Sequence, residues 1–389
     1  MSRSMVGGLR RLDRAIGRRS GRRRILIDAR TPVNFTMVAP IYRAMSADPR
    51  LAFSFTASED PHLLADIYHE APGVTLVPTG RARFMRFDAY VASDFMWQSL
   101  PRGTCRIMTF HGVGGKYGFD ALTESMRMWD RIFFANHRRL RNFIASGAID
   151  ADSPAVRMVG LPKTDALVDG TWTREGVLAT LGLEPALPTI LYAPTWSPAS
   201  SLNAMGLDLI QRIVTAWSGS VNLIVKLHDR SRDLRTRYSG GVDWAAAIAP
   251  LLRGRTGVVA PGHDITPYLV AADVMVTDHS SAGFEFLLRD RPIVRIDRPE
   301  LIASANIHPD YVALLASVSE SVSSSSAVVA ALERALSTPD DLREVRRTVA
   351  EDLFYRPGGA TARAVRQLYE AIELDPMLAA VAQEAACRS

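Results

Sequence analysis

The sequence predicts an α/β protein with doubly wound parallel sheets. Short apolar runs rich in β-branched residues alternate with amphipathic helical segments along most of the 389 residues. The clearest unit spans 273–297, where a buried strand is followed by a polar turn, a helix and a second strand. Such a unit places the turn from Asp278 to Ser281 at the carboxyl edge of a parallel sheet, where open α/β proteins bind ligands.

The composition agrees with a two-domain cytoplasmic protein. With 389 residues, of which 47% are hydrophobic, the chain can fill two cores. It has no apolar run of about 18 residues, which a membrane-spanning helix needs, and its start lacks the apolar core of a signal peptide. Cys105 and Cys387 show no metal-ligand spacing, so we expect two free thiols and no metal.

The alternation of strands and helices predicts a first domain over 25–170 and a second over 171–365. Predicted strands of the first domain are 25–27, 53–56, 74–77, 90–94, 106–110, 131–135 and 156–159, with helices at 34–45 and 61–68. In the second domain we predict strands 189–193, 221–227, 257–260, 273–278 and 293–296, with helices 174–181, 207–217, 265–272 and 327–336. Residues 321–326, rich in serine, predict the start of the helix 327–336 with a loose turn before it. Residues 366–389 hold most of a last helix, 364–374, and a tail.

The first 24 residues carry nine arginines and a single acid, Asp13. If they are helical, Met5, Leu9, Leu12 and Ile16 share one face, which gives a short basic amphipathic helix suited to an anionic membrane surface. A disordered basic tail is the alternative. Nucleic acid is not the expected partner, because no interleaving of aromatic and basic residues accompanies these charges.

The turn Asp278-His279-Ser280-Ser281 carries the chemistry expected of an anion-binding site. The start of a helix presents backbone N–H groups and a partial positive charge, and two hydroxyl groups add donors that suit phosphate oxygens. The alternative is an ordinary helix cap. Two other predicted strand ends offer polar groups at the same sheet edge, namely Thr195 with Ser197 and Lys226 with His228.

A second candidate lies in the loop His111-Gly112-Val113-Gly114-Gly115-Lys116, which follows a predicted strand. Its glycines let backbone amides approach a ligand, and the lysine can meet an anion. It is not a Walker loop, because the Gly-Lys-Ser/Thr ending is missing. A flexible loop with a surface histidine is the alternative. Against 43 arginines, the chain keeps only three lysines, and all lie in such motifs: Lys116, Lys163 and Lys226.

Taken together, the motifs resemble those of the CDP-glycerol glycerophosphotransferases, which build teichoic acids and related polymers. The resemblance covers residues 107–363 and is carried by His111-Gly112, Gly160-Leu161-Pro162-Lys163-Thr164-Asp165, Leu191-Tyr192-Ala193-Pro194-Thr195-Trp196, Lys226-Leu227-His228, Thr277-Asp278-His279-Ser280-Ser281 and Gly358-Gly359-Ala360-Thr361-Ala362-Arg363.

This resemblance implies a GT-B architecture, two Rossmann-like domains, with a CDP-alcohol held mainly by the second. It implies transfer of a polyol phosphate to a polymer or lipid-linked acceptor, with release of CMP, by an enzyme peripheral to the cell membrane and without a cofactor. His111 is then the expected general base, and His228 is the second catalytic residue. Substrate-binding residues are expected to be Gly112, Lys116, Lys163, Thr195, Lys226, Asp278, Ser280, Ser281, Glu285 and Arg363.

Four positions depart from the family pattern. Val113 and Gly114 replace a threonine and a proline, Asp229 replaces the proline after His228, and His279 replaces a tyrosine. These departures leave the donor alcohol open and keep two rivals in view. One is a GT-B glycosyltransferase that uses a nucleotide sugar, and the other is a non-catalytic scaffold for polymer export.

Overall fold

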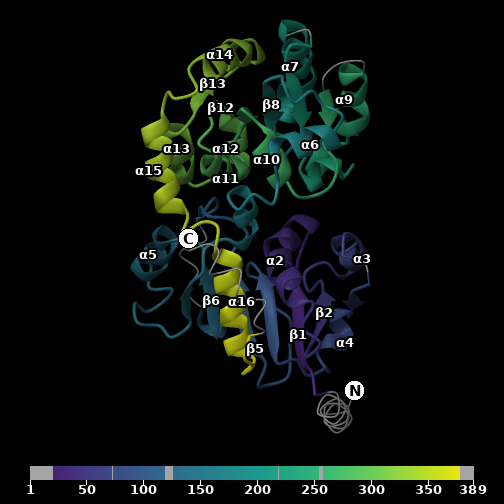
Figure 1. The fold of residues 1–389 in the computed structure, drawn as a ribbon, viewed down its shortest axis with the longest axis vertical. Coiled ribbons are helices and arrows are strands. Elements are labelled where there is room, and N and C mark those ends of the chain that lie inside the picture. The colour runs from purple at the N-terminus through teal and green to yellow at the C-terminus, as the bar shows by residue number, and fades with distance from the viewer. Residues whose placement is uncertain (1–20, 72, 119–125, 218, 254–256, 377–389) are drawn as a thin grey trace. The chain divides into compact units, whose positions relative to one another are not determined.

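The computed structural model describes residues 21–376 except 72, 119–125, 218 and 254–256. These residues form two compact units, each built on one parallel sheet (Figure 1). The first unit contains the described residues up to 113, residues 126–165 and the segment from Phe354 onward, and the second contains 114–118 and 166–353. Residues 1–20, which hold most of the predicted basic helix, lie outside the described residues.

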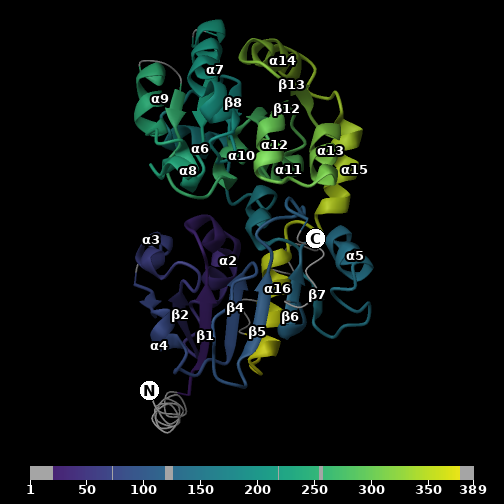
Figure 2. The ribbon, with the colours of Figure 1, turned by 180° about the vertical axis from the view of Figure 1, so that it is seen from behind.

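The first unit has strands in the order β3-β2-β1-β4-β5-β6-β7, seen side by side in Figure 2. Their bounds are β1 (Arg23–Asp28), β2 (Leu51–Thr56), β3 (Thr75–Leu76), β4 (Ala89–Ser93), β5 (Cys105–Thr109), β6 (Arg131–Phe134) and β7 (Val156–Met158). The helices are α2 (Pro32–Met45), α3 (Leu64–Ile67), α4 (Thr79–Ala82), α5 (His137–Ala145) and α16 (Ala360–Ala371), with the 3₁₀ helices η1 (Pro61–Leu63) and η3 (Met126–Met128).

The sheet of the first unit is buried on both faces, which explains why its strands are apolar without strict alternation. On β1, Ile25 and Ile27 pack on one face with residues of α2 and α16. Leu26, between them, packs on the other face with Phe143 of α5. Cys105 in β5 is a free cysteine, as predicted, and Cys387 lies outside the described residues.

The second unit has strands in the order β10-β9-β8-β11-β12-β13, and every described strand pair in both sheets is parallel. The strands are β8 (Thr189–Tyr192), β9 (Asn222–Val225), β10 (Gly257–Val259), β11 (Val274–Thr277), β12 (Ile293–Ile296) and β13 (Glu320–Val322). The helices are α6 (Arg174–Thr180), α7 (Ser201–Trp217), α8 (Thr236–Ser239), α9 (Trp244–Leu252), α10 (Thr266–Ala271), α11 (Ala282–Phe286), α12 (Pro299–Ser304), α13 (Pro309–Ser317), α14 (Ser325–Ser337) and α15 (Arg343–Leu353), with η5 (Asp229–Arg232) and η6 (Leu287–Arg289). The 3₁₀ helix η4 (Pro162–Leu167) belongs to the first unit up to Asp165 and to the second from Ala166.

In both sheets the chain starts in the middle and then winds in the two directions. The strand order therefore reverses between β1 and β4 in the first unit and between β8 and β11 in the second. The crevice beyond the carboxyl ends of the strands at such a switch point is where doubly wound sheets bind ligands. The loops after these four strands are consequently the places to look for a site.

Several elements were not predicted from the sequence. The serine-rich segment starts α14, with Ser324 at its N-cap, as predicted, but the residues before it form the edge strand β13 (Glu320–Val322) beside β12 and not a loose turn. Helices α5 and α15 have few apolar residues, and each buries an arginine, Arg139 or Arg346. Their apolar and charged residues nevertheless lie on opposite faces, so both helices are amphipathic although they were not predicted.

The end of the chain lies in a different unit from the one predicted. Residues from Phe354 to the predicted boundary at 365 belong to the first unit, and residues 114–118 belong to the second. Helix α16, drawn in yellow in Figure 1, packs on the sheet of the first unit through Ala364, Val365 and Leu368. These apolar contacts decide the assignment, because an amphipathic helix joins whichever core covers its apolar face.

Candidate functional site

The switch point of the second unit is organised by Asp278, which follows β11 and is fully buried. Its Oδ1 accepts a hydrogen bond from the backbone N–H of Thr195 at 2.8 Å, and its Oδ2 accepts bonds from the N–H and the hydroxyl group of Ser201, both at 3.0 Å. Asp278 thus ties the loop after β8 and the start of α7 to the end of β11. This is a structural role, and it holds the neighbouring polar groups in place.

Lys116 lies in the same unit, next to Thr195. Its Nζ donates a hydrogen bond to Thr195 Oγ1 at 3.3 Å and lies 5.9 Å from the centre of the Tyr311 ring. Burial lowers the pKa of Lys116 to about 8, although the Asp278 carboxylate acts in the opposite direction. The lysine is therefore a desolvated cation whose charge an anionic ligand would stabilise.

His228 leaves β9 toward the same edge, and its tautomer follows from its contacts. Nδ1 accepts a hydrogen bond from the backbone N–H of Arg230 at 3.2 Å, which places the ring proton on Nε2. Burial lowers the pKa of His228 to about 4, with Asp229 opposing and Arg230 adding to the decrease. At neutral pH the ring is uncharged and offers an Nε2–H donor that suits a phosphate oxygen.

The remaining predicted residues of the second unit have distinct environments. Lys226 is buried and donates to the carbonyl oxygens of Gly262 at 2.8 Å and Leu227 at 3.1 Å. Ser280 Oγ accepts a long bond from the N–H of Ala282, and Ser281 lies at the N-cap position of α11 without a side-chain capping bond. Glu285 is buried inside α11. The predicted helix after this turn is short, because α11 ends at Phe286 and continues as η6.

His111 belongs to the first unit, where it follows the end of β5. Its Nδ1 lies 2.8 Å from Oδ2 of Asp94, which follows the neighbouring strand β4. The Asp94 side chain is 8% exposed and the His111 side chain 46%, so a buried carboxylate holds a ring that reaches solvent. The adjacent Gly112 is buried, and its carbonyl oxygen accepts a hydrogen bond from Arg139 at 3.2 Å.

The Gly160 to Asp165 motif and the Gly358 to Arg363 motif bind to each other within the first unit. Asp165 accepts hydrogen bonds from the N–H groups of Ala360 at 3.0 Å and Thr361 at 2.7 Å, which caps α16. Arg363 donates to the carbonyl oxygens of Val159 at 2.7 Å and Tyr355 at 3.1 Å. The amides that a phosphate at the start of α16 would need therefore already have an acceptor.

Gly160 shows why the motif begins with glycine. Its φ is +91°, and a Cβ atom there would lie 2.8 Å from the carbonyl oxygen of Tyr355. Any side chain would be strained and would push this segment away from Arg363. Lys163, three residues on, is buried in the first unit as well. Of the predicted site residues, His111, Gly112, Lys163 and Arg363 thus belong to the first unit and the others to the second.

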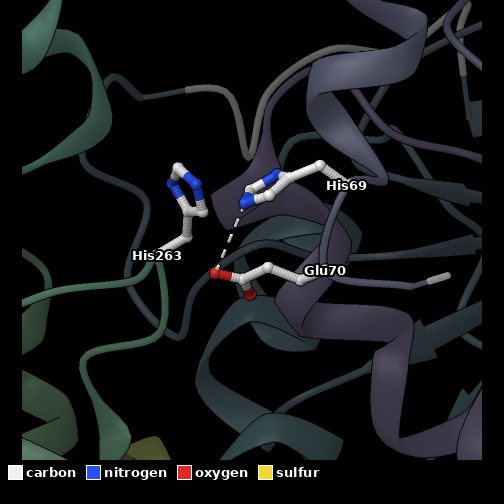
Figure 3. A group of neighbouring side chains, drawn as sticks. All are labelled: His69, Glu70 and His263. Carbon is white, nitrogen blue, oxygen red and sulfur yellow. Dashed lines mark ion pairs between the residues drawn. The ribbon is translucent and has the colours of Figure 1, made fainter.

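Two further histidines form polar pairs within their own units. His69 and Glu70 make an exposed ion pair of 3.9 Å in the first unit (Figure 3). His263, also drawn there, belongs to the second unit, where its Nδ1 lies 2.6 Å from Oδ1 of Asp229. Asp229 is the residue that departs from the family pattern, and its replacement of a proline allows this pair.

Sequence reasoning missed Asp94 and the Asp229–His263 pair. The signal for Asp94 was present, because an acid ends a predicted strand next to the strand that delivers His111. The pairing of β4 with β5, which brings them together, could not be read from the sequence. His263 follows β10 and meets Asp229 only because β9 and β10 are neighbours.

Comparisons with known proteins agree on the family and the fold. The family model described as CDP-Glycerol:Poly(glycerophosphate) glycerophosphotransferase matches residues 34–370. The wall teichoic acid polymerase TagF has a similar structure, with a TM-score of 0.68 at 13% identity over 90% of this chain and 89% of that chain. No curated protein sequence matches the chain.

Structures of other proteins with bound UDP compounds have a similar fold. The structure titled S. aureus MnaA-UDP matches with a TM-score of 0.55 at 11% identity over 91% of this chain and 98% of that chain. UDP-GlcNAc 2-epimerase from Neisseria meningitidis matches with a TM-score of 0.54 at 13% identity, over 90% of this chain and 100% of that chain. With the sheet orders above, these likenesses support the predicted GT-B-like fold.

Proposed function

The chain belongs to the CDP-glycerol:poly(glycerophosphate) glycerophosphotransferase family, and we propose that it moves a polyol phosphate from a CDP-alcohol to a hydroxyl group of a surface polymer or lipid-linked acceptor. The observation that carries this proposal is the family match over 34–370, which takes in every predicted site residue and every described strand except β1. The polar groups at the switch point of the second unit agree with an anionic ligand.

In this proposal the second unit holds the two phosphates of the donor. Lys116 supplies a positive charge, and neutral His228 donates an Nε2–H hydrogen bond. Thr195, Ser280 and Ser281 add hydroxyl groups at the same sheet edge. Phosphoryl transfer depends mainly on positioning and on neutralising negative charge, and these groups do both.

His111 is the proposed general base. The acceptor hydroxyl gives its proton to His111 Nε2 while its oxygen forms a bond to the phosphorus that bears the alcohol. The bond between that phosphorus and the bridging oxygen breaks, and CMP leaves with the electron pair. An imidazole suits this step at neutral pH, and an Nδ1 held by a carboxylate leaves Nε2 to face the substrate.

The acceptor is proposed to be a polymer or lipid-linked molecule at an anionic membrane surface, where the arginine-rich first 24 residues would hold the protein. Among the described residues, no helix is both long enough and apolar enough to cross a membrane. Pelleting with anionic but not with neutral vesicles, lost when residues 1–20 are deleted, would support this surface attachment, since this deletion leaves β1 intact. Equal binding to both kinds of vesicle would count against it.

The test uses purified protein with CDP-glycerol, CDP-ribitol and a panel of UDP- and GDP-sugars, with and without a chelator. A CDP-alcohol at a hundred times its Kd should stabilise the fold by about 2.7 kcal/mol, and slow release of CMP should accompany it. We expect His111→Ala to lower turnover about 10²-fold or more while donor stabilisation remains. His228→Ala should weaken the donor stabilisation itself.

The exposed His62 provides a matched control, and His62→Ala should behave like wild type. Stabilisation by a UDP- or GDP-sugar alone, with release of a nucleoside diphosphate, would replace this proposal with sugar transfer. No stabilisation by any nucleotide compound would favour the scaffold. Full turnover in His111→Ala would remove His111 from its proposed role.

A further inference from the structure

Asp94 belongs to none of the motifs that carry the family resemblance, yet its carboxylate is the partner of His111. Oδ2 of Asp94 lies 2.8 Å from Nδ1 of His111. Asp94 follows β4 and His111 follows β5, two neighbouring strands in which Ser93 pairs with Thr109. The contact is therefore set by the sheet and not by a flexible loop alone.

The backbone of Asp94 adopts a conformation that side chains rarely tolerate. Its φ is +93°, in the left-handed region, and its N–H donates a hydrogen bond to the carbonyl oxygen of Thr109 at 2.7 Å. Glycine would fit this backbone without strain. Strained residues of this kind cluster at functional sites, which directs attention to the carboxylate.

The surroundings of Asp94 keep its carboxylate ionised although it is buried. Burial raises the pKa of Asp94, but His111, Arg30 and Arg139 together outweigh burial and hold the pKa below the ordinary value. Nη2 of Arg30 lies 3.5 Å from Oδ2 of Asp94, and its Nε pairs with Glu59 at 2.7 Å. An ionised carboxylate can only accept, so it selects a protonated Nδ1 in its histidine partner.

We propose that Asp94 is a positioning residue that keeps the ring proton of His111 on Nδ1 and so presents an unprotonated Nε2 to the acceptor hydroxyl. This inference rests on the proposed function of His111 and adds the residue that prepares it. During the transfer, the hydroxyl proton moves to Nε2 while Nδ1–H remains bonded to Asp94. The carboxylate stabilises the resulting imidazolium and is not itself protonated.

Two substitutions separate the carboxylate from the backbone. Asp94→Gly suits the positive φ and removes the carboxylate, whereas Asp94→Asn keeps the shape but lets an amide donate to or accept from Nδ1. Asn306→Gly is the matched control, because Asn306 is exposed and also has a positive φ, of +49°.

The readouts are the ¹⁵N chemical shifts of the His111 ring, which distinguish its tautomers, and the steady-state constants. Wild type should carry the neutral-ring proton on Nδ1, and both Asp94 variants should lose this preference. We expect kcat to fall about tenfold or more in both, with a donor KM close to the wild-type value. Asn306→Gly should match wild type in every measurement.

Two results would overturn the proposal. One is full turnover in Asp94→Gly, which would mean that only the backbone conformation matters. The other is an unchanged His111 tautomer in both Asp94 variants. The NMR readout needs no turnover and therefore separates the two proposals. If the His111 tautomer depends on Asp94 but the protein is inactive with every CDP-alcohol, the proposed function fails and the role of the Asp94 contact stands.

Discussion

At the residue scale, burial decides the charge of two histidines in the second unit. His279 is fully buried, and burial together with Arg295 lowers its pKa to about 4, against Asp278 and Asp297. His228 has a pKa of about 4 as well. Both rings are therefore neutral in the folded protein at neutral pH, and both become protonated in the unfolded chain below about pH 6.5.

The resulting prediction concerns stability at acid pH. Above about pH 6.5 a histidine whose folded pKa lies below its unfolded value is neutral in both states and has no effect on stability. Between about pH 6.5 and 4 the unfolded chain binds a proton that the folded protein does not, so the free energy of unfolding falls as the pH drops. His279→Gln should reduce this fall, by about 3 kcal/mol at most for a difference of two to three pKa units. Urea unfolding followed by circular dichroism at pH 7.0 and 4.5 measures it.

His62→Gln serves as the control for this experiment, since its ring is exposed in η1. It should show the same decrease in unfolding free energy between the two pH values as wild type. If the unfolding free energy of His279→Gln falls between the two pH values by as much as that of wild type, the pKa of His279 is not lowered by folding, and the prediction fails.

At the scale of single elements, α16 depends on a cap that comes from almost 200 positions earlier. Asp165 accepts two backbone hydrogen bonds from its first residues, and Arg363 closes the same turn. A carboxylate at a helix N-terminus also interacts favourably with the helix dipole. The Gly160 to Asp165 and Gly358 to Arg363 motifs are thus explained by the way this helix starts.

Asp165→Ala should lower the free energy of unfolding by about 1–2 kcal/mol, because two buried N–H groups lose their acceptor. The comparison is Asp243→Ala, which removes a single cap bond of 3.0 Å from α9 at an exposed position. Urea unfolding of both variants gives the two values. A loss in Asp165→Ala no larger than in Asp243→Ala would argue against the double cap.

At the scale of the whole molecule, the chain returns to its first unit after completing the second. Leu368 of α16 lies in the same core as Ile25 and Ile27 of β1, more than 300 positions earlier. Two doubly wound sheets therefore do not divide the chain into two continuous halves. The last helix supplies part of the core in which the first strand is packed.

Leu368→Asp should consequently destabilise β1 and β2 more than α14, although α14 is much nearer to Leu368 in the sequence. A charge placed in this core should raise amide hydrogen exchange in β1 and β2, while α14 in the second unit stays protected. Hydrogen exchange with mass spectrometry reads both regions. The control is Arg366→Asp, on the exposed side of α16, which should leave amide exchange in β1 unchanged. Amide exchange in β1 as slow in Leu368→Asp as in wild type would contradict this packing.

Much of the fold could be predicted because parallel strands and their helices leave local patterns. Every strand expected in the two sheets is present, with bounds that differ by at most two residues at each end. Helices α5 and α15 escaped prediction because they are rich in charged residues and their amphipathic pattern rests on few apolar ones. Strand β13 escaped because its Ser321 and flanking residues look like a turn until β12 pairs with them.

The candidate site, too, has features that the sequence predicts and features that only the fold sets. The sequence by itself determined the two-sheet class, the polar strand ends and the family motifs, since each depends on residues close together in the chain. Only the tertiary structure decided that Asp94 holds His111, that Asp165 caps α16 and that burial keeps His228 uncharged. The partner of a side chain depends on which strands are neighbours, and its protonation state depends on how deeply it is buried. Neither is a local property of the sequence.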